Sequence, residues 1–480
     1  MITDFRDIQR VLSLVDGTIA TEDDVRNMLN NIIAKSNDDF LNELKTYISD
    51  NTKKCISELQ SVSGETVKLC KKGKCDACSL KKWCSKYRSE LQQREMERQA
   101  FTYADFFCGA GGLSLGFKSE GFKLSLANDI QKCCIDTYSF NHPETPSTHI
   151  IANDINCVIE NVQSLRRFKE IDVVAGGPPC QGFSMANRQR IIDDPRNHLY
   201  KSYIAAIEKL KPKFVVMENV RGMLNVVDQI YEDFENVGYS ITARLLNAKD
   251  FGVPQNRERL IFIGNRIGAD NDLIFEHLYK LSSNSKKRKL SDAITDLEPR
   301  HAKTEKNSTE IENDKSGYTI DLKTKIKRND YLNELSCLGD EYCKLLFNHK
   351  ARYNNERDIE IFSRLNPGDD STDPKIQDIM PYKRREKIFK DKYYKLEYDR
   401  PCKTITAHMK FDCNMYIHPT QARGLTPREA ARVQSYPDDY YFRGAYTTTY
   451  MQVGNSVPPL LSKKIASVIR KELEEYHGSL

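Results

Sequence analysis

The chain has 480 residues, of which 39% are apolar and 29% charged, and its formal net charge of +5 does not by itself point to any class of partner. No apolar run is long enough to span a bilayer, and residues 1–7 carry charges where a secretory signal needs an apolar stretch. This composition predicts a cytoplasmic protein without a membrane partner. We therefore expect the fourteen cysteines to be thiols, metal ligands or nucleophiles and not disulfides.

Residues 1–99 predict a small helical N-terminal module. Apolar side chains recur at helical spacing over 40–48, and a very polar run, 86–99, ends the segment. Four cysteines fall within fifteen residues of this module: Cys70, Cys75, Cys78 and Cys84. Thiols this close together in a reducing compartment predict a metal centre, with ordinary thiols and no metal as the alternative.

From residue 101 the pattern changes to short apolar runs that alternate with helical spacing. The expected strands are 103–107, 122–127, 171–175, 214–217 and 260–263. Short apolar runs of this length are typical of buried parallel strands. The alternation predicts an α/β fold for residues 100–265, with a doubly wound, mostly parallel sheet whose ligands bind beyond the carboxyl ends of the strands.

A glycine-rich turn, DFFCGAGG at 105–112, lies between the first expected strand and a helical pattern. Glycines at such a turn let a cofactor approach the backbone and the free amides of a helix N-terminus. Asp129 stands twenty residues past Gly109, after the second strand, where its carboxylate can accept hydrogen bonds from ribose hydroxyls. Asp154 follows the next apolar stretch. Together they predict a nucleotide-like cofactor, with a purely structural turn as the alternative.

A cysteine with two prolines before it follows the expected strand 171–175. Pro178 and Pro179 fix the backbone ahead of Cys180, which is an unusual way to build a core position. A rigid loop that presents a thiol to a cleft predicts a nucleophile.

Three charged residues accompany the strands 214–217 and 260–263. Glu218 ends the first of these strands, so its carboxylate should emerge at the same edge of the sheet as the thiol. Arg257 and Arg259 lie just before the second strand. Surface salt bridges are the alternative interpretation of all three.

The regular alternation fades over 266–395, which predicts an inserted domain of less regular structure. Its end, 375–400, holds nine basic and five acidic residues with aromatic side chains among them. Such a stretch suits a phosphate backbone, but a solvated helix face with its aromatics in the core is an equal alternative. The pattern tightens again over 396–480, where the capping box at 426–429 predicts a helix to about residue 434.

These motifs resemble those of the DNA cytosine-5 methyltransferases in their order and approximate spacing. The resemblance runs from residue 101 to about residue 466, interrupted by the variable insertion. It rests on PPCQ at 178–181, ENV at 218–220, QNRER at 255–259 and GNSV at 454–457, preceded by GLTPREAAR at 424–432.

The resemblance implies a role for each matching residue. Those that fall where the family holds S-adenosylmethionine are Phe107, Gly109, Gly111, Gly112, Asp129, Asp154, Pro179, Asn455 and Ser456. Cys180 falls on the nucleophile and Glu218 on the carboxyl that engages ring nitrogen 3 of cytosine. Arg257 and Arg259 match the arginines that line the base pocket. Cys108, in the glycine turn, is not expected to be the nucleophile.

The resemblance also implies a substrate and a setting. We expect double-stranded DNA whose target cytosine is flipped out, with 184–190 filling the gap and 266–395 as the target-recognition region. The family suggests the modification arm of a restriction–modification system with a partner nuclease, acting as a monomer on nucleoid DNA. A tRNA cytosine-5 methyltransferase and a catalytically inactive DNA-binding regulator are the alternatives. A nicotinamide dehydrogenase would explain Gly109 and Asp129 but not Cys180.

The N-terminal cysteines lie outside that resemblance. The text KCDACSL at 74–80 is similar to the cluster loop of endonuclease-III-type DNA glycosylases, which carries a four-iron four-sulfur cluster. The first gap between cysteines is two residues shorter here, which leaves the ligand assignment open. Zinc is the alternative metal, and no glycosylase core accompanies the loop.

Overall fold

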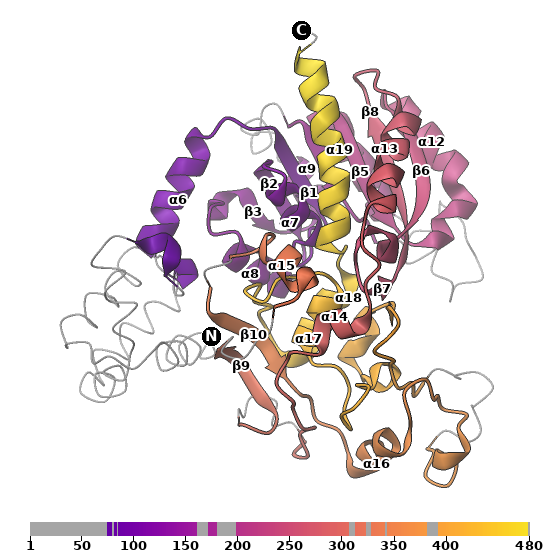
Figure 1. Ribbon diagram of the computed structural model, residues 1–480. Helices are drawn as coiled ribbons and strands as arrows, with labels where there is room; N and C mark the ends of the chain where they lie inside the picture. Colours follow the sequence, from indigo (N-terminus) through magenta and orange to yellow (C-terminus); the bar gives the residue numbers. More distant parts are fainter. Residues whose placement is uncertain are drawn as a thin grey trace, which may run out of the picture.

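The computed structural model describes most of the chain in two lobes, an upper one built on a sheet and a lower one that is less regular (Figure 1). The described residues are 74–78, 81–83, 85–160, 171–179, 198–306, 313–322, 328–340, 343–381 and 392–478. Cys70, Cys84, Cys180 and the expected gap-filling loop 184–190 lie outside them. No helix in these ranges is long and apolar enough to cross a membrane.

A seven-stranded sheet with the order β3-β2-β1-β4-β5-β8-β6 forms the upper lobe. Its strands are β1 (Thr102–Phe106), β2 (Lys123–Asp129), β3 (Ile150–Ala152), β4 (Val173–Gly176), β5 (Phe214–Asn219), β6 (Ser240–Asn247) and β8 (Glu258–Asn265). The first five pair in parallel. The predicted α/β fold with a mostly parallel sheet is confirmed.

The strand expected at 260–263 exists but runs antiparallel, so its expected direction was wrong. β8 pairs with β5 in the register Phe214↔Asn265 and with β6 in the register Ser240↔Asn265, both antiparallel. It is buried between two strands, and such a strand reads as an apolar run whichever way it points. Only a short connection separates β6 from β8, whereas a parallel return needs a crossover of a dozen or more residues.

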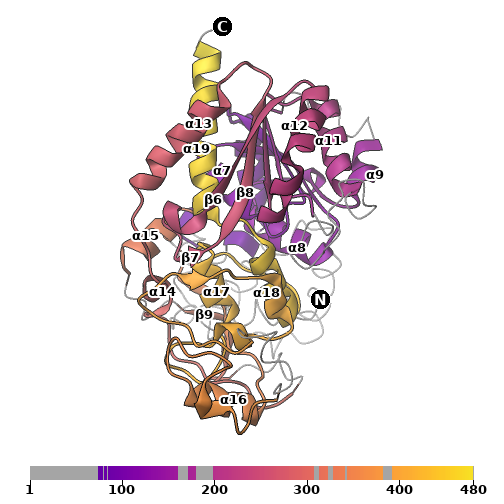
Figure 2. The same cartoon turned by 90° about the vertical axis from the view of Figure 1, so that its right-hand side faces the viewer.

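Helices cover both faces of the sheet (Figure 2). One face packs against α7 (Gly112–Ser119), α13 (Asn271–Ser283) and α19 (Pro459–Gly478). The other packs against α9 (Ile155–Glu160), α11 (His198–Leu210) and α12 (Val227–Asn236). The sheet is therefore doubly wound, as predicted. α13 belongs to these layers although it falls inside the expected inserted region 266–395.

The lower lobe has a second apolar core. Its elements include α14 (Leu290–Ile294), β9 (Gly317–Leu322), α15 (Asp330–Ser336), β10 (Leu345–Lys350), α16 (Glu356–Arg364), α17 (Pro427–Val433) and α18 (Tyr446–Asn455). The predicted capping box starts α17. The Glu429 amide donates to Thr426 Oγ1 at 3.1 Å, and the Thr426 amide donates to Glu429 Oε2 at 2.7 Å.

Tyr393 and Lys395, two described residues of the basic stretch 375–400, have structural roles. The Tyr393 ring is buried against Phe362, and the Lys395 ammonium donates to the carbonyl oxygens of Phe362 at 2.9 Å and Leu365 at 2.8 Å. The sequence left two interpretations of this stretch open, a DNA-binding segment and a solvated face with its aromatic side chains in the core. The second interpretation is correct for the Tyr393 side chain. Lys395 is not available to a DNA phosphate.

Candidate active site

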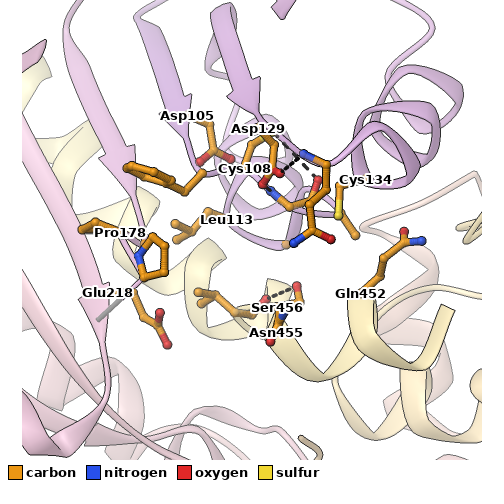
Figure 3. A pocket seen from close by; sticks show the side chains of 18 of the residues that line it. Asp105, Cys108, Leu113, Asp129, Cys134, Pro178, Glu218, Gln452, Asn455 and Ser456 are labelled. Carbon is orange, nitrogen blue, oxygen red and sulfur yellow. Dashed lines mark hydrogen bonds between the residues drawn. The ribbon is translucent and has the colours of Figure 1, made fainter. Parts of the chain in front are cut away.

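A cavity of about 350 Å³ lies beyond the carboxyl ends of β1, β2, β4 and β5 (Figure 3). The glycine turn, the ends of β2 and β5, Pro179 and the segment 454–457 line it. Its volume falls within the range of about 300–1,000 Å³ typical of small-molecule sites. The cavity thus lies at the edge of the sheet where the ligand site is predicted.

The glycine turn adopts left-handed backbone conformations that open it toward the cavity. Phe107 has φ +56° and Gly109 has φ +52°. A bulky residue in this region costs on the order of 1–3 kcal/mol, a strain that is common at binding sites. A Cβ added at Gly109 would meet no atom within 4 Å, so this side of the turn faces open space.

The next two glycines serve packing. Gly111 does not line the cavity, and a Cβ there would lie 2.8 Å from the Tyr440 hydroxyl. A Cβ at Gly112 would lie 2.2 Å from Ser456 Oγ. Both positions therefore need glycine so that the turn can approach the C-terminal part of the chain.

Two carboxylates from neighbouring strand ends line the cavity, as predicted. Asp129 accepts the Gly109 amide at 2.9 Å and the Gln131 amide at 2.8 Å, which fixes both of its oxygens. Asp154 accepts the Asn156 amide at 2.8 Å. Each oxygen keeps a lone pair for a ligand donor. Burial raises the pKa of Asp129 from its ordinary value.

Asp105 is a third carboxylate in the cavity wall, to which the sequence motif alone assigned no role. Its side chain is 1% exposed, and Ser114 Oγ donates to Oδ2 at 2.6 Å. Its Oδ1 has no hydrogen-bond partner among the described residues. Burial raises the pKa of Asp105 to about 7. Buried carboxylate oxygens normally have partners, so this one is suited to a donor from a ligand.

Glu218 and Arg259 form an ion pair at the other end of the cavity, where Arg259 Nε lies 2.7 Å from Glu218 Oε1. Both side chains are largely buried, so this is not the surface salt bridge of the alternative interpretation. Asn219, which the sequence left without a role, donates from Nδ2 to the Pro178 carbonyl at 2.9 Å. This bond fixes the proline loop beside Glu218. Cys180, the next residue after Pro179, lies outside the described residues.

Arg257 also lines the cavity, but its guanidinium is used to hold the backbone. It donates to the carbonyl oxygens of Ile405 at 2.7 Å, Gly454 at 3.2 Å and Ser456 at 2.9 Å. Burial, with Arg259 close by, lowers the pKa of Arg257 to about 9. Arg257 thus supports the wall that carries Asn455 and Ser456.

This chain matches known proteins over the residues that build the sheet and the cavity. Residues 101–471 match the family described as C-5 cytosine-specific DNA methylase. The chain belongs to this family. This methylase is 33% identical over 380 residues to the Type II methyltransferase M1.HphI of Haemophilus parahaemolyticus, covering 78% of this chain and 87% of the relative. It is 34% identical over 390 residues to the Type II methyltransferase M.DdeI of Desulfomicrobium norvegicum, covering 76% and 87%.

A solved structure agrees with the fold. The crystal structure of a prophage-encoded E. coli protein covers 78% of this methylase and 100% of its own chain, with a TM-score of 0.60 at 24% identity. Family membership confirms the predicted DNA cytosine-5 methyltransferase activity and the S-adenosylmethionine cofactor. It supports this activity over the tRNA enzyme, the inactive regulator and the dehydrogenase.

The cavity of the methylase fits S-adenosylmethionine, a ligand with ribose hydroxyls, an adenine amine and a cationic end. The open side of Gly109 leaves room against the backbone. Asp129 and Asp154 offer oriented acceptors, and the unpartnered Asp105 oxygen offers one more. Asn455 is exposed at the end of α18 and completes the opposite wall.

Cys108 lies in the glycine turn of the methylase but is poorly suited to attack a base. Its side chain is buried, and burial raises the pKa of its thiol well above the ordinary value. A thiol that stays protonated is a weak nucleophile. The expectation that Cys108 is not the nucleophile agrees with this environment.

Proposed function

We propose that this methylase attacks a flipped-out cytosine of duplex DNA with Cys180 and assists the attack with Glu218 and Arg259. One observation carries the proposal. Pro179, which directly precedes Cys180, lines the same cavity as Glu218, Gly109 and Asp129. A single space therefore joins the predicted cofactor site to the predicted base site.

The chemistry needs a nucleophile and a proton donor, because carbon 5 of cytosine does not attack a methyl group unaided. The Cys180 thiolate forms a bond to carbon 6, and the ring electrons move toward carbon 5. The Glu218 carboxyl holds a proton at ring nitrogen 3, and Arg259 stabilises the carbonyl oxygen. When bound, S-adenosylmethionine supplies an electrophilic methyl carbon. Loss of the carbon 5 proton to solvent restores the ring double bond and expels the Cys180 thiolate, the proton at ring nitrogen 3 returns to Glu218, and S-adenosylhomocysteine leaves with the methylated base.

The remaining predicted residues have supporting roles in this proposal. Two residues from the C-terminal part of the chain, Asn455 and Ser456, line the cofactor site together with Phe107, Gly109, Gly112, Asp129, Asp154 and Pro179. Gly111 lets the turn pack, and Arg257 holds the wall. Rotating the base out of the duplex costs a few kcal/mol, which contacts in the pocket must offset.

The proposed setting is a restriction–modification system with a partner nuclease. It is supported by relatives that are named Type II methyltransferases. We propose a cytoplasmic, nucleoid-associated monomer, with DNA recognition by the inserted region. A nuclease gene beside the methylase gene would support this setting, and its absence would favour a solitary enzyme.

A trapping experiment tests the nucleophile. Cys180→Ser should abolish methylation of plasmid DNA, and only the wild type should form a covalent adduct with DNA that contains 5-fluorocytosine. Cys337→Ser is the matched control, because Cys337 is an exposed thiol of the lower lobe. An active Cys180→Ser enzyme would remove Cys180 from the mechanism.

We further propose that the N-terminal cysteines hold an iron–sulfur cluster, with zinc as the alternative. Cys75 begins the 3-10 turn η1 (Cys75–Ala77), and the Cys78 amide donates to the Cys75 carbonyl at 3.0 Å, so the two residues share one tight turn. No group of three or more metal ligands occurs among the described residues, and Cys70 and Cys84 lie outside them. Visible absorbance together with bound iron would support the cluster, and bound zinc would support the alternative. A purified protein that contains neither iron nor zinc would contradict the proposal.

A further inference from the structure

Two lysines of the cysteine-bearing segment reach the joint between the two lobes. Lys81 and Lys82 lie in the 3-10 turn η2 (Lys81–Trp83), shortly after Cys78. The family match begins only at residue 101, so neither lysine belongs to the methylase domain. Both are largely buried, which is unusual for lysines in so short a segment.

Lys82 joins the catalytic lobe to the chain that follows α17. Its ammonium donates to Asp439 Oδ2 at 2.9 Å and to the Asp439 carbonyl at 2.7 Å. It also lies 3.5 Å from the amide oxygen of Asn141, the last residue of α8 (Lys132–Asn141). The same helix supplies Cys134 to the wall of the cofactor cavity.

Lys81 reaches the inserted region. Its ammonium lies 2.7 Å from Asp340 Oδ2, and the Asp340 amide donates to Asp439 Oδ2 at 3.0 Å. The two lysines and the two aspartates therefore meet at one point. A Cβ added at Gly339 would lie 2.1 Å from Asp439 Oδ1, so the backbone at Gly339 packs tightly against the Asp439 side chain.

Helix α6 (Ser85–Glu97) follows the lysines in the chain and packs against the catalytic lobe (Figure 1). Arg88 Nη2 donates to the Ser139 carbonyl at 3.1 Å, and Gln92 Nε2 donates to the Pro143 carbonyl at 3.2 Å. Lys81 also donates to the Asp76 carbonyl at 2.6 Å, which ties it to the turn that carries Cys75 and Cys78. The turn, the helix and the lobes thus form a continuous chain of contacts.

We infer that the cysteine-bearing segment is a clamp, in which Lys81 and Lys82 are positioning residues that set the inserted region relative to the catalytic lobe. The inference rests on the proposed function, in which the inserted region binds DNA around the target base. A flipped cytosine reaches Glu218 only if both lobes engage the same site, so a loose joint weakens productive DNA binding. Cofactor binding does not depend on the joint.

The test measures DNA binding and methylation by the full-length chain. The probe is linear plasmid DNA from a host without cytosine methylation. Lys82→Met should weaken DNA binding and raise the KM for DNA by about tenfold, an effect typical of a broken contact between partly buried groups. The Kd for S-adenosylmethionine should stay within about twofold of the wild type. Lys82→Arg should restore DNA binding, which a loss of packing alone would not allow.

A matched control and a second variant keep the test decisive. Arg94→Met removes a cation of α6 whose partner Glu90 lies 4.0 Å away at the surface, and it should behave as the wild type. Asp340→Asn should reproduce the DNA defect if Lys82→Met fails to fold. Unchanged DNA binding in Lys82→Met or Asp340→Asn overturns the clamp. A wild type that binds DNA without methylating it would overturn the proposed function, while DNA binding would still test the clamp.

Discussion

Arg259 and Glu218 neutralise each other across 2.7 Å in the cavity before any base arrives. The pair holds the carboxyl beside the proline loop, where a cytosine ring must enter. In the proposed mechanism, an incoming base gives each member a new partner, the carbonyl oxygen for Arg259 and ring nitrogen 3 for Glu218. The ion pair thus holds both side chains in the cavity, and it opens when each member takes its new partner.

Glu218→Gln should lower kcat by at least about 100-fold, because an amide cannot supply a proton to ring nitrogen 3. The Kd for S-adenosylmethionine should not change, since Glu218 lies at the opposite end of the cavity from Cys134 and Gln452 (Figure 3). Single-turnover methylation of plasmid DNA measures the first effect and calorimetry the second. Glu258→Gln is the control, because the Glu258 side chain is exposed and forms an exposed ion pair with Arg221. Normal turnover by Glu218→Gln would refute its role.

The two arginines should fail in different ways. Arg257→Ala removes the donors of three backbone carbonyls, at a cost of about 1–3 kcal/mol for each buried group left without a partner. We expect a melting temperature lower by several degrees and weaker binding of S-adenosylmethionine. Arg259→Ala should keep the melting temperature near that of the wild type and lose kcat. Thermal unfolding and calorimetry on the two variants decide between these roles, and identical defects would contradict the division.

Of the strands of the catalytic lobe, β3, with only three residues, was not expected, whereas β1, β2, β4, β5 and β8 could be predicted because each contains a short apolar run. β6 could not, since Arg244 and other half-buried side chains interrupt it. The direction of β8 depends on pairing with β5 and β6, and no local pattern encodes that pairing. The existence of a strand could thus be predicted from the sequence where consecutive residues are buried, but the direction of the strand could not.

The site divides in the same way. The positions of Asp129, Asp154 and Glu218 at one edge of the sheet could be predicted, because each follows an expected strand or an apolar stretch and the carboxyl ends of parallel strands meet at that edge. Arg257 holds the backbone through the carbonyl groups of Ile405 and Ser456, which are 148 and 199 residues away along the chain. Motif spacing does not reveal contacts between residues so far apart in the sequence. The unpartnered oxygen of Asp105 likewise becomes visible only once Ser114 is known to occupy the other oxygen.

Asp105 should make the stability of the cofactor-free protein depend on pH. Burial raises the pKa of its carboxyl to about 7, whereas an unfolded aspartate titrates near about 4. Between these values the folded chain holds a proton that the unfolded chain releases, so this group's contribution to stability falls as pH rises through 7. Asp105→Asn removes the titration.

Thermal unfolding at pH 5 and pH 8 checks this prediction. The melting temperature of Asp105→Asn relative to the wild type should be higher at pH 8 than at pH 5, by up to several degrees. Asp136→Asn, on the surface of α8, is the control and should show no such trend. A difference that does not vary with pH would mean that Asp105 titrates near its ordinary value.

Phe411 should contact DNA beside the target base. Its ring is 63% exposed, with Lys410 Nζ 4.8 Å from the ring centroid and the His408 ring at 5.2 Å. Arg352 holds the loop by donating to the carbonyls of Met409 and Phe411, both at 2.9 Å. An exposed aromatic ring beside a lysine is suited to stacking on a nucleic-acid base.

The loop also lies against the cavity wall, because a Cβ added at Gly454 would meet the Ala407 amide at 2.2 Å. Phe411→Ala should weaken DNA binding by about tenfold, as expected for the loss of one stacked base. The salt dependence should stay unchanged, since no phosphate contact is removed. Tyr279→Ala, an exposed aromatic on α13, is the control. Filter binding at several salt concentrations measures both quantities. Wild-type affinity in Phe411→Ala would exclude the ring from the interface, and a shallower salt slope would indicate a lost phosphate contact instead of stacking.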